Sequence, residues 1–288
     1  MSSSQALEVP DLAQRSPGSP SSPNANGNGT AAKAYSRYSR WFRAWRAWVL
    51  PIAVIALWYV AVPDSPTPHG IWVSPEQVWR AGAEQVRSGG LTRAVEASLK
   101  REFTGFSIGA ALGLILGAVL GLSKWADRTI GPSFNAVKQV SLFAWIPLIS
   151  VWFGLGDTAK VVFLSLAALV PVVVHTADGI RSVPATQREV ARVFRYRPWQ
   201  TAFYIVLPSA SSSIFTGIYL ALIYSWLATL GAEYLLVAGS GIGNLLVDGS
   251  EQFRMDEVLF GVIVVGFIGA LLNALGRAVQ RIFFAHAA

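Results

Sequence analysis

The sequence predicts an all-α polytopic membrane protein with about six transmembrane helices. Hydrophobic residues make up 53% of its 288 residues and charged residues only 14%, so the chain is far more apolar than a soluble domain. The apolar residues gather into runs close to the roughly 20 residues that a helix needs to cross about 30 Å of hydrocarbon. The runs cover residues 48–63, 103–123, 139–155, 161–177, 214–238 and 258–276. The first, third and fourth are short for a full crossing, so we expect their ends to extend into flanking polar residues or their helices to tilt.

The segment before and including the first run divides into two parts. Residues 1–40 are rich in Ser, Pro, Asn and Gly, contain little that could be buried, and are expected to form a disordered cytoplasmic tail. Residues 41–64 contain arginine interleaved with aromatic residues and then the first span. Such a stretch beside a span is typical of a cytoplasmic membrane anchor, a reading that we favour over nucleic-acid binding. No small-residue cleavage site follows the run, so a cleaved signal peptide is not expected.

Residues 65–102 are predicted to form an external segment with a short amphipathic helix. Ser74 directly before Pro75 is a helix-start signal, with Ser74 as the cap and Pro75 at the first helical position. A glycine pair then breaks the chain, and residues 91–100 are expected to form the first turns of the second span.

The second run carries glycine at every fourth position. These residues are Gly105, Gly109, Gly113, Gly117 and Gly121. At about 100° per residue they form one slowly drifting stripe, which lets a neighbouring helix approach the backbone closely. We favour helix packing within one subunit as the role of this stripe. The alternative, that it lets helices slide during transport, stays open.

A polar loop between two apolar runs, residues 178–208, is the most informative part of the chain. It contains five arginines, so it must lie in water on one side of the membrane. An amphipathic helical segment between two spans is suited to dock a soluble partner. At this loop the chain resembles the permease subunits of ABC importers, whose cytoplasmic coupling loop reads Glu-Ala-Ala, three residues, Gly, and then a variable stretch ending in Leu-Pro. The matching residues are Glu189, Ala191, Leu207 and Pro208, while Val190 stands at the first Ala and Arg195 at the Gly.

The resemblance implies a type I ABC importer-like permease fold, with a permease core over residues 103–285. It further implies a homodimer in the bacterial inner membrane, a cytoplasmic ABC ATPase subunit bound to each copy, and a periplasmic solute-binding protein. In this picture the coupling helix inserts into a groove of the ATPase. Ala191 would face that groove, and Glu189 would hold the loop or meet a basic group of the partner. Because Arg195 replaces the glycine, the bend at this position lacks its usual residue, and Pro198 is an alternative source of a turn.

Two further stretches resemble the permeases for nitrate, sulfonates and taurine. One runs from Ile146 through Trp152 to Gly154, and the other pairs Ala232-Glu233 with Ser240-Gly241-Ile242-Gly243. The residues assigned to a translocation path or gate are Pro147, Trp152, Glu233, Ser240, Gly241 and Gly243. Pro147 and Pro171 interrupt core spans, and each can kink its helix by removing a backbone hydrogen bond.

Glu233 is the only carboxylate that these span assignments place well inside hydrocarbon, where a charge is expensive. It is expected to line the path, to pair with a cation from another helix, or to lie nearer the outer interface. We favour a structural or gating role over direct contact with substrate.

The distribution of lysine and arginine predicts the orientation. With a cytoplasmic N-terminus and six spans, 16 of these residues fall inside and 7 outside, which together make the 23 in the chain. This asymmetry places both termini and the Glu189 loop in the cytoplasm. The net charge of +7 follows from this topology, although anionic lipid would also be attracted.

Several functions are disfavoured by missing motifs. There is no Gly-x-x-x-x-Gly-Lys-Ser/Thr phosphate loop, so ATP hydrolysis is expected in a separate subunit. No catalytic or metal-binding residues are assigned, no cofactor is expected, and nucleic acid is not a predicted partner.

The leading hypothesis is therefore the permease of an ATP-driven importer for a small anionic solute such as a sulfonate, taurine or nitrate. An ion-coupled secondary transporter, which would show inverted repeats and several buried charges, is the alternative. A membrane-embedded enzyme would need a catalytic cluster that is not visible.

Overall fold

The computed structural model shows helices and no strand in the residues that it describes. The described residues are 49–62, 73–236 and 238–284. The chain divides into two compact units, residues 1–60 and 61–288, and each is described by itself. In the first unit the described residues belong to the helix Val49–Ala61, and the expected tail over residues 1–40 lies outside the described part.

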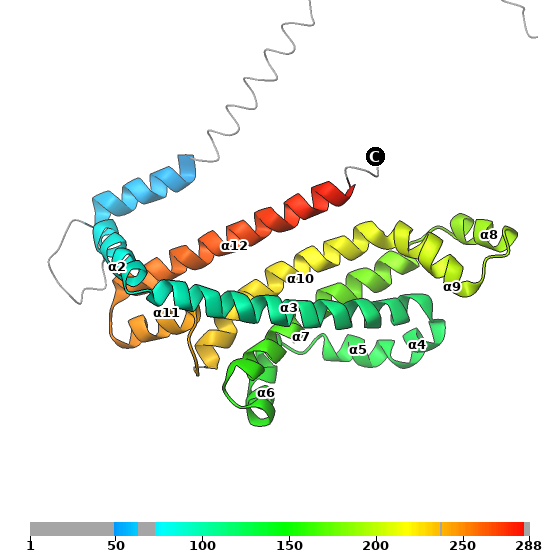
Figure 1. Cartoon of the computed structure of the whole chain (residues 1–288), viewed down its shortest axis with the longest axis horizontal. Helices are drawn as coiled ribbons and strands as arrows, with labels where there is room; N and C mark the ends of the chain where they lie inside the picture. The colour runs from blue at the N-terminus through cyan, green and yellow to red at the C-terminus, as the bar shows by residue number, and fades with distance from the viewer. Residues whose placement is uncertain (1–48, 63–72, 237, 285–288) are drawn as a thin grey trace, which may run out of the picture. The chain divides into compact units, whose positions relative to one another are not determined.

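The second unit is a succession of long and short helices (Figure 1). In chain order they are α2 (Pro75–Arg87), α3 (Gly90–Leu122), α4 (Lys124–Thr129), α5 (Gly131–Val137), the 3₁₀-helix η1 (Leu142–Trp145), α6 (Ile146–Phe153), α7 (Asp157–Arg181), α8 (Ala185–Val193), α9 (Pro198–Thr201), the π-helix η2 (Ala202–Val206), α10 (Leu207–Leu235), α11 (Ile242–Glu251) and α12 (Met255–Phe284).

Among the described residues, four helical stretches are long and apolar enough to cross a bilayer. They are α3, α7, the stretch Pro198–Leu235 that ends with α10, and α12. Four of the six expected spans are thus confirmed as single helical stretches within the described part of the chain. The run 139–155 belongs to a pair of helices bent by 93°, which counts at most as a fifth span. The bend falls where Lys138, Gln139 and Ser141 interrupt the apolar sequence, and the helix Val49–Ala61 is shorter than the other spans.

The helix ends in the structure can be compared with the capping, glycine and proline residues of the sequence. Ser74 accepts a hydrogen bond from the N–H of Gln77 and its own N–H donates to the Gln77 side chain, so the cap that the sequence predicts is confirmed. Gly89 has a left-handed φ of 70°, and α3 begins directly after it. Pro147 lies in the first turn of α6, where a missing N–H costs little, so the kink expected there is wrong. Pro171 does lie inside its helix, α7.

Helix α7 lies between α3 and α10 and has its most extensive contacts with these two (Figure 1). Its side chains supply much of the core, and Phe163, Ala168 and Val172 are fully buried. All five glycines of the four-residue repeat face α7. A Cβ added to them would meet Leu164 Cβ at 2.6 Å (Gly105), Ser165 O at 2.2 Å (Gly109), Val172 Cβ at 2.8 Å (Gly113), Thr176 Cβ at 2.7 Å (Gly117) and Ile180 Cβ at 2.8 Å (Gly121). The two backbones approach this closely because α3 presents hydrogen in place of side chains.

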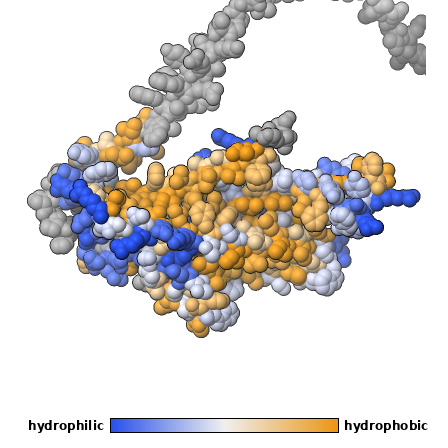
Figure 2. All heavy atoms as spheres, viewed as in Figure 1, coloured by the Kyte–Doolittle hydropathy of each residue, from blue (hydrophilic) through white to orange (hydrophobic). Residues whose placement is uncertain are grey.

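Hydrophobic and hydrophilic residues occupy different parts of the surface of the second unit. Figure 2 shows hydrophobic residues gathered over the long helices, with hydrophilic residues near α8 at one end and near α2 and α11 at the other. Many large apolar side chains on α3 and α12 are exposed, including Ile115 and Phe267. Exposed apolar surface on helices of this length is typical of contact with lipid.

Candidate functional site

Six polar residues come together where α3, the start of α7, the end of α10 and the start of α11 meet. We call Ser98, Arg101, Asp157, Lys160, Glu233 and Asn244 the charged cluster. All of them except Asp157 are buried. Because charges are costly to bury unless they are paired and hydrogen-bonded, the contacts within this cluster decide whether the fold tolerates it.

Arg101 is the centre of the cluster. Its Nη2 lies 2.5 Å from Glu233 Oε1 and donates to the Ser240 carbonyl at 2.5 Å, while its Nη1 lies 2.6 Å from Asp157 Oδ1. The Arg101 and Glu233 side chains are 6% and 1% exposed, so this is a buried ion pair between α3 and α10. The Asp157 side chain is 67% exposed, and it links the pair to the first residue of α7.

Glu233 accepts further hydrogen bonds from neighbouring elements. The Ser98 hydroxyl donates to Oε1 at 2.7 Å, and the backbone N–H of Gly243 donates to Oε2 at 2.7 Å. Gly243 lies in the first turn of α11, where free N–H groups and the helix dipole favour a carboxylate. Ser98 in turn accepts from the N–H of Ile242 at 3.0 Å. Glu233 therefore holds the start of α11 against α3 and α10.

The Ser-Gly-Ile-Gly motif is explained by this close approach. A Cβ on Gly241 would lie 2.4 Å from Glu233 Oε1 and 2.5 Å from Arg101 Nη2, and one on Gly243 would lie 2.5 Å from Glu233 Cβ. Any side chain at either position would push against the ion pair. Ser240 contributes its carbonyl oxygen to Arg101.

Two more buried charges lie next to these contacts. Lys160 is fully buried, and its Nζ donates to the Ala238 carbonyl at 2.8 Å and to Asn244 Oδ1 at 3.4 Å. Glu102 is also fully buried, and it accepts from the hydroxyls of Ser225 at 2.5 Å and Thr229 at 2.9 Å on α10. Lys160 thus fixes the connection between α10 and α11, and Glu102 joins α3 to the middle of α10.

The structure therefore brings together four of the six residues assigned to the path or gate: Glu233, Ser240, Gly241 and Gly243. Of the three positions expected for Glu233, the structure shows the pairing with a cation of another helix. Pro147 and Trp152 lie on α6, and the Trp152 side chain is exposed. Sequence reasoning missed Arg101, Lys160 and Glu102, which it assigned to external segments.

The second candidate site is the loop between α7 and α10, at the opposite ends of these helices from the charged cluster. Its helix α8 is held by Arg188, which donates to the Ile180 carbonyl at 2.7 Å, and by Gln187, which accepts from the Ser209 hydroxyl at 2.7 Å. These contacts set which face of α8 points outward. Glu189 is exposed and free to meet a partner.

Ala191 does not face outward. It is 1% exposed and is buried by its own chain, so the expectation that it faces an ATPase groove is wrong. The outward apolar face of α8 is instead formed by Val190, Val193 and Phe194, which are 49%, 80% and 69% exposed. Their i, i+3, i+4 spacing places them on one side of the helix.

The bend after α8 is present despite the missing glycine. The N–H of Tyr196 donates to the Ala191 carbonyl at 2.9 Å, and the N–H of Arg195 donates to the Arg192 carbonyl at 3.0 Å. This is the hydrogen-bond pattern of a Schellman motif, with Arg195 at the left-handed position and a φ of 53°. Arg195 itself therefore makes the turn, and Pro198 instead begins α9.

Replacing Arg195 with glycine should stabilise this bend. Glycine adopts the left-handed conformation without the Cβ clash that costs other residues about 1 kcal/mol. Amide hydrogen exchange across residues 185–196 should slow by about fivefold in Arg195→Gly. Arg192→Gly, inside α8, is the matched control and should speed exchange by a similar factor. Unchanged exchange in Arg195→Gly would show that the bend carries no strain.

The Leu-Pro pair begins α10 directly after the π-helix η2. Pro208 cannot donate a backbone hydrogen bond and would clash with the carbonyl four residues earlier in a regular helix. A π turn relieves such a conflict by widening the helix. The pair thus lies at the junction between the loop and the span.

The described residues contain no group of three or more His, Asp or Glu side chains that could hold a metal ion. The cluster instead connects four helices through ion pairs and hydrogen bonds, and the loop presents an exposed helix. Long apolar helices, a buried polar junction at one end and an exposed amphipathic helix at the other define a membrane transport subunit.

Comparison with known proteins identifies the family. Residues 109–287 match the family described as "Binding-protein-dependent transport system inner membrane component", and the chain belongs to this family. It is thus a multi-pass inner-membrane permease of a binding-protein-dependent ABC importer, in which the ATPase is a separate subunit.

Relatives and solved structures agree with this assignment. The chain is 32% identical over 233 residues to the "Putative aliphatic sulfonates transport permease protein SsuC" of Bacillus subtilis, covering 81% of this chain and 84% of that protein. It is 33% identical over 185 residues to the "Bicarbonate transport system permease protein CmpB" of Synechococcus elongatus, covering 64% and 66%. A structure of the MetNI methionine ABC transporter has a similar fold, with a TM-score of 0.58 at 18% identity, over 73% of this chain and 99% of that one.

Proposed function

We propose that this permease forms the translocation path for a small anionic solute, delivered by a periplasmic binding protein and driven by ATPase subunits that dock on α8. The observation that carries the proposal is the exposed apolar face of α8, held between two spans by Arg188 and Gln187. A rigid amphipathic helix outside the membrane is suited to a groove on a soluble partner.

Helix α10 connects the two candidate sites. It follows the loop through η2, and Glu233 lies near its C-terminal end. A displacement of α8 by the ATPase would therefore act along α10 on the ion pair between Glu233 and Arg101. In this proposal the charged cluster is the gate, and the closing of two ATPase subunits on a permease homodimer opens it.

The proposed orientation places α8 and both termini in the cytoplasm. It is supported by the excess of lysine and arginine on that side, 16 against 7 in the whole chain. Arg101 and Lys160 were counted among the 7, although they are buried in helices and belong to no loop. Leaving them out makes the asymmetry larger.

An anionic solute is supported by the relatives. The two relatives described above are named for transport of aliphatic sulfonates and bicarbonate, which are both anions. The substrate range of this chain is taken from that similarity.

A charge on the outward face of α8 tests the docking proposal. Val193→Asp should reduce pull-down of the ATPase subunit at least tenfold, because it places a carboxylate in an apolar contact. Val193 is 80% exposed, so the permease should still insert and purify normally. Val86→Asp is the matched control, since Val86 is 55% exposed on α2, far from the loop, and should leave pull-down unchanged. Full ATPase binding by Val193→Asp would mean that another surface docks the partner.

The rival, an ion-coupled transporter, predicts uptake without an ATPase. The structure shows more buried charges than the sequence indicated, which is one feature of such transporters, but each is paired or hydrogen-bonded within the fold. Uptake into proteoliposomes that contain the permease with and without its ATPase distinguishes an ATP-driven importer from an ion-coupled transporter. We expect uptake only with ATPase and ATP, and ion-driven uptake by the permease alone would favour the rival.

A further inference from the structure

Helix α4 begins where the charge-free part of α3 ends. Residues 103–122, which complete α3, contain no charged side chain and extend about 30 Å at 1.5 Å per residue. This length matches the roughly 30 Å of hydrocarbon in a bilayer. Ser123 then caps α4 by accepting a hydrogen bond from the N–H of Ala126 at 3.3 Å. Helix α4 therefore lies at the surface of the membrane.

The two sides of α4 differ in their surroundings. On one side Ala126 is buried, and Asp127 forms an ion pair with Arg181 at the end of α7. The other side is formed by the exposed residues Lys124, Trp125 and Arg128, which we call the basic face. With 3.6 residues per turn, these three positions fall within about 100° of the helix circumference. Trp125 is 73% exposed, so most of its ring is open to a partner.

The other charged residues nearby balance one another. Asp127 and Asp178 both form ion pairs with Arg181, and Lys138 lines the same small cavity as the two carboxylates. These two anions are thus matched by two cations, and neither is left to neutralise the basic face. In the described part of the chain, the two cations of the basic face form neither a side-chain hydrogen bond nor an ion pair.

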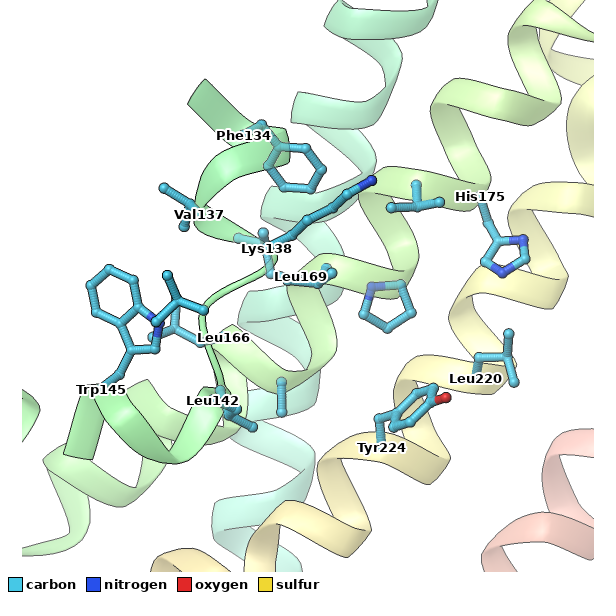
Figure 3. Close-up of a pocket in the computed structure, with 15 residues that line it drawn as sticks. Phe134, Val137, Lys138, Leu142, Trp145, Leu166, Leu169, His175, Leu220 and Tyr224 are labelled. Atoms are coloured by element: carbon cyan, nitrogen blue, oxygen red, sulfur yellow. The ribbon is translucent and has the colours of Figure 1, made fainter. Parts of the chain in front are cut away.

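The helix that follows, α5, contributes to a cavity instead. Figure 3 shows Phe134 and Val137 of α5, and Lys138 directly after it, in the wall of a cavity of about 520 Å³ between α5, η1, α7 and α10. No residue of α4 lines this cavity. The basic face is therefore a surface separate from it.

An apolar strip on α3 leads toward the basic face. It consists of the exposed residues Ile115, Val119 and Leu122, whose i, i+4, i+7 spacing places them on one side of the helix. Over seven residues the strip extends about 10 Å, which is long enough to contact several methylene groups of an acyl chain. Trp125 follows the strip at the depth where tryptophan is enriched in membrane proteins.

We propose that the basic face binds an anionic phospholipid such as phosphatidylglycerol. Lys124 and Arg128 bind its headgroup, the ring of Trp125 lies beside the glycerol, and the acyl chains lie along the apolar strip. Each cation at a membrane surface strengthens attraction to anionic lipid by about fivefold. The bound lipid holds α4 in place and, through the ion pair of Asp127 with Arg181, also the end of α7. This site goes beyond the proposed transport function and does not depend on an ATPase.

Quenching by brominated lipids measures this binding at the site itself. The chain has no native cysteine, so Leu122→Cys carries a single fluorophore at the end of the apolar strip. In nanodiscs of the full-length permease, brominated phosphatidylglycerol should bind beside the label about tenfold more tightly than brominated phosphatidylcholine, or better. Lys124→Gln should reduce this preference about fivefold, and Lys124→Gln with Arg128→Gln should abolish it. Arg87→Gln with Arg93→Gln, which removes the same charge at two exposed positions elsewhere, is the matched control and should keep the preference.

Amide hydrogen exchange over residues 123–130 gives a second measurement. Replacing phosphatidylcholine with phosphatidylglycerol should slow this exchange about threefold in the wild type and leave it unchanged in the double variant of the basic face. All variants should unfold at the wild-type temperature, because exposed charges contribute little to stability.

Four outcomes would overturn the proposal. The first is a wild-type lipid preference in the double variant of the basic face, and the second is an equal loss of preference in the matched control. The third is a disulfide between two Trp125→Cys copies, which would show that a second copy of the chain covers this face. The fourth is loss of the lipid preference when the ATPase subunit is added, which would assign the face to the ATPase.

Discussion

Replacing Glu233 with leucine is expected to cause a large loss of stability and to abolish uptake. The substitution leaves the Arg101 guanidinium buried without its main counter-ion, and it leaves the Ser98 hydroxyl and the Gly243 N–H without their acceptor. Breaking a buried ion pair by removing one partner costs about 3–5 kcal/mol. Thermal unfolding of the purified permease in detergent, together with uptake into proteoliposomes, measures both effects.

Two further variants distinguish the effect of losing the charge of Glu233 from the effect of losing the shape of its side chain. Glu233→Gln keeps an oxygen for Ser98 and Arg101 but turns an amide group toward the N–H of Gly243, so it should be milder than leucine and still defective. Asp157→Asn removes the exposed partner of the same arginine and should cost less than about 1 kcal/mol. Wild-type stability and uptake in Glu233→Leu would show that the cluster neither supports the fold nor acts as a gate.

The buried partners of Glu233 could not be predicted from hydropathy. The sequence places the second and fourth spans from residues 103 and 161, whereas α3 begins at Gly90 and α7 at Asp157. Arg101 and Lys160 therefore fell just outside the apolar runs and were counted with the external loops. Hydropathy treats a charged residue as the end of a span, because it cannot detect the ion pair that permits burial.

The loop between α7 and α10 shows a related difficulty. Its motif residues Leu207 and Pro208 lie at the start of α10. Which face of α8 points outward depends on contacts of Arg188 and Gln187 with segments outside the helix, so the sequence misassigned Ala191. The glycine repeat was more informative, since a four-residue period of small side chains needs only helical geometry to predict a contact stripe. The helix that packs against this stripe, α7, could be identified only from the structure.

Adding side chains to that stripe is the second change with a large expected effect. A Cβ at Gly109 would lie 2.2 Å from the Ser165 carbonyl oxygen, a backbone atom that cannot move unless α3 and α7 separate. Gly109→Leu should therefore prevent stable packing of the two helices, and Gly109→Ala should already cost about 1–3 kcal/mol through overpacking. We expect a low yield of monodisperse protein for leucine and a lower unfolding temperature for alanine.

The matched control is Gly266→Ala on α12, where an added Cβ would meet nothing within 4 Å. Because alanine favours helix more than glycine by about 1 kcal/mol, this variant should be as stable as the wild type or more stable.

The two roles considered for the glycine stripe, helix packing and helix sliding, make opposite predictions for uptake by Gly109→Ala. If the glycines serve only packing, uptake per folded transporter should survive while stability falls. If they let α3 and α7 slide during transport, uptake should be lost even at a temperature where the variant is folded. Equal unfolding temperatures for Gly109→Ala and the wild type would contradict the close approach of the two backbones.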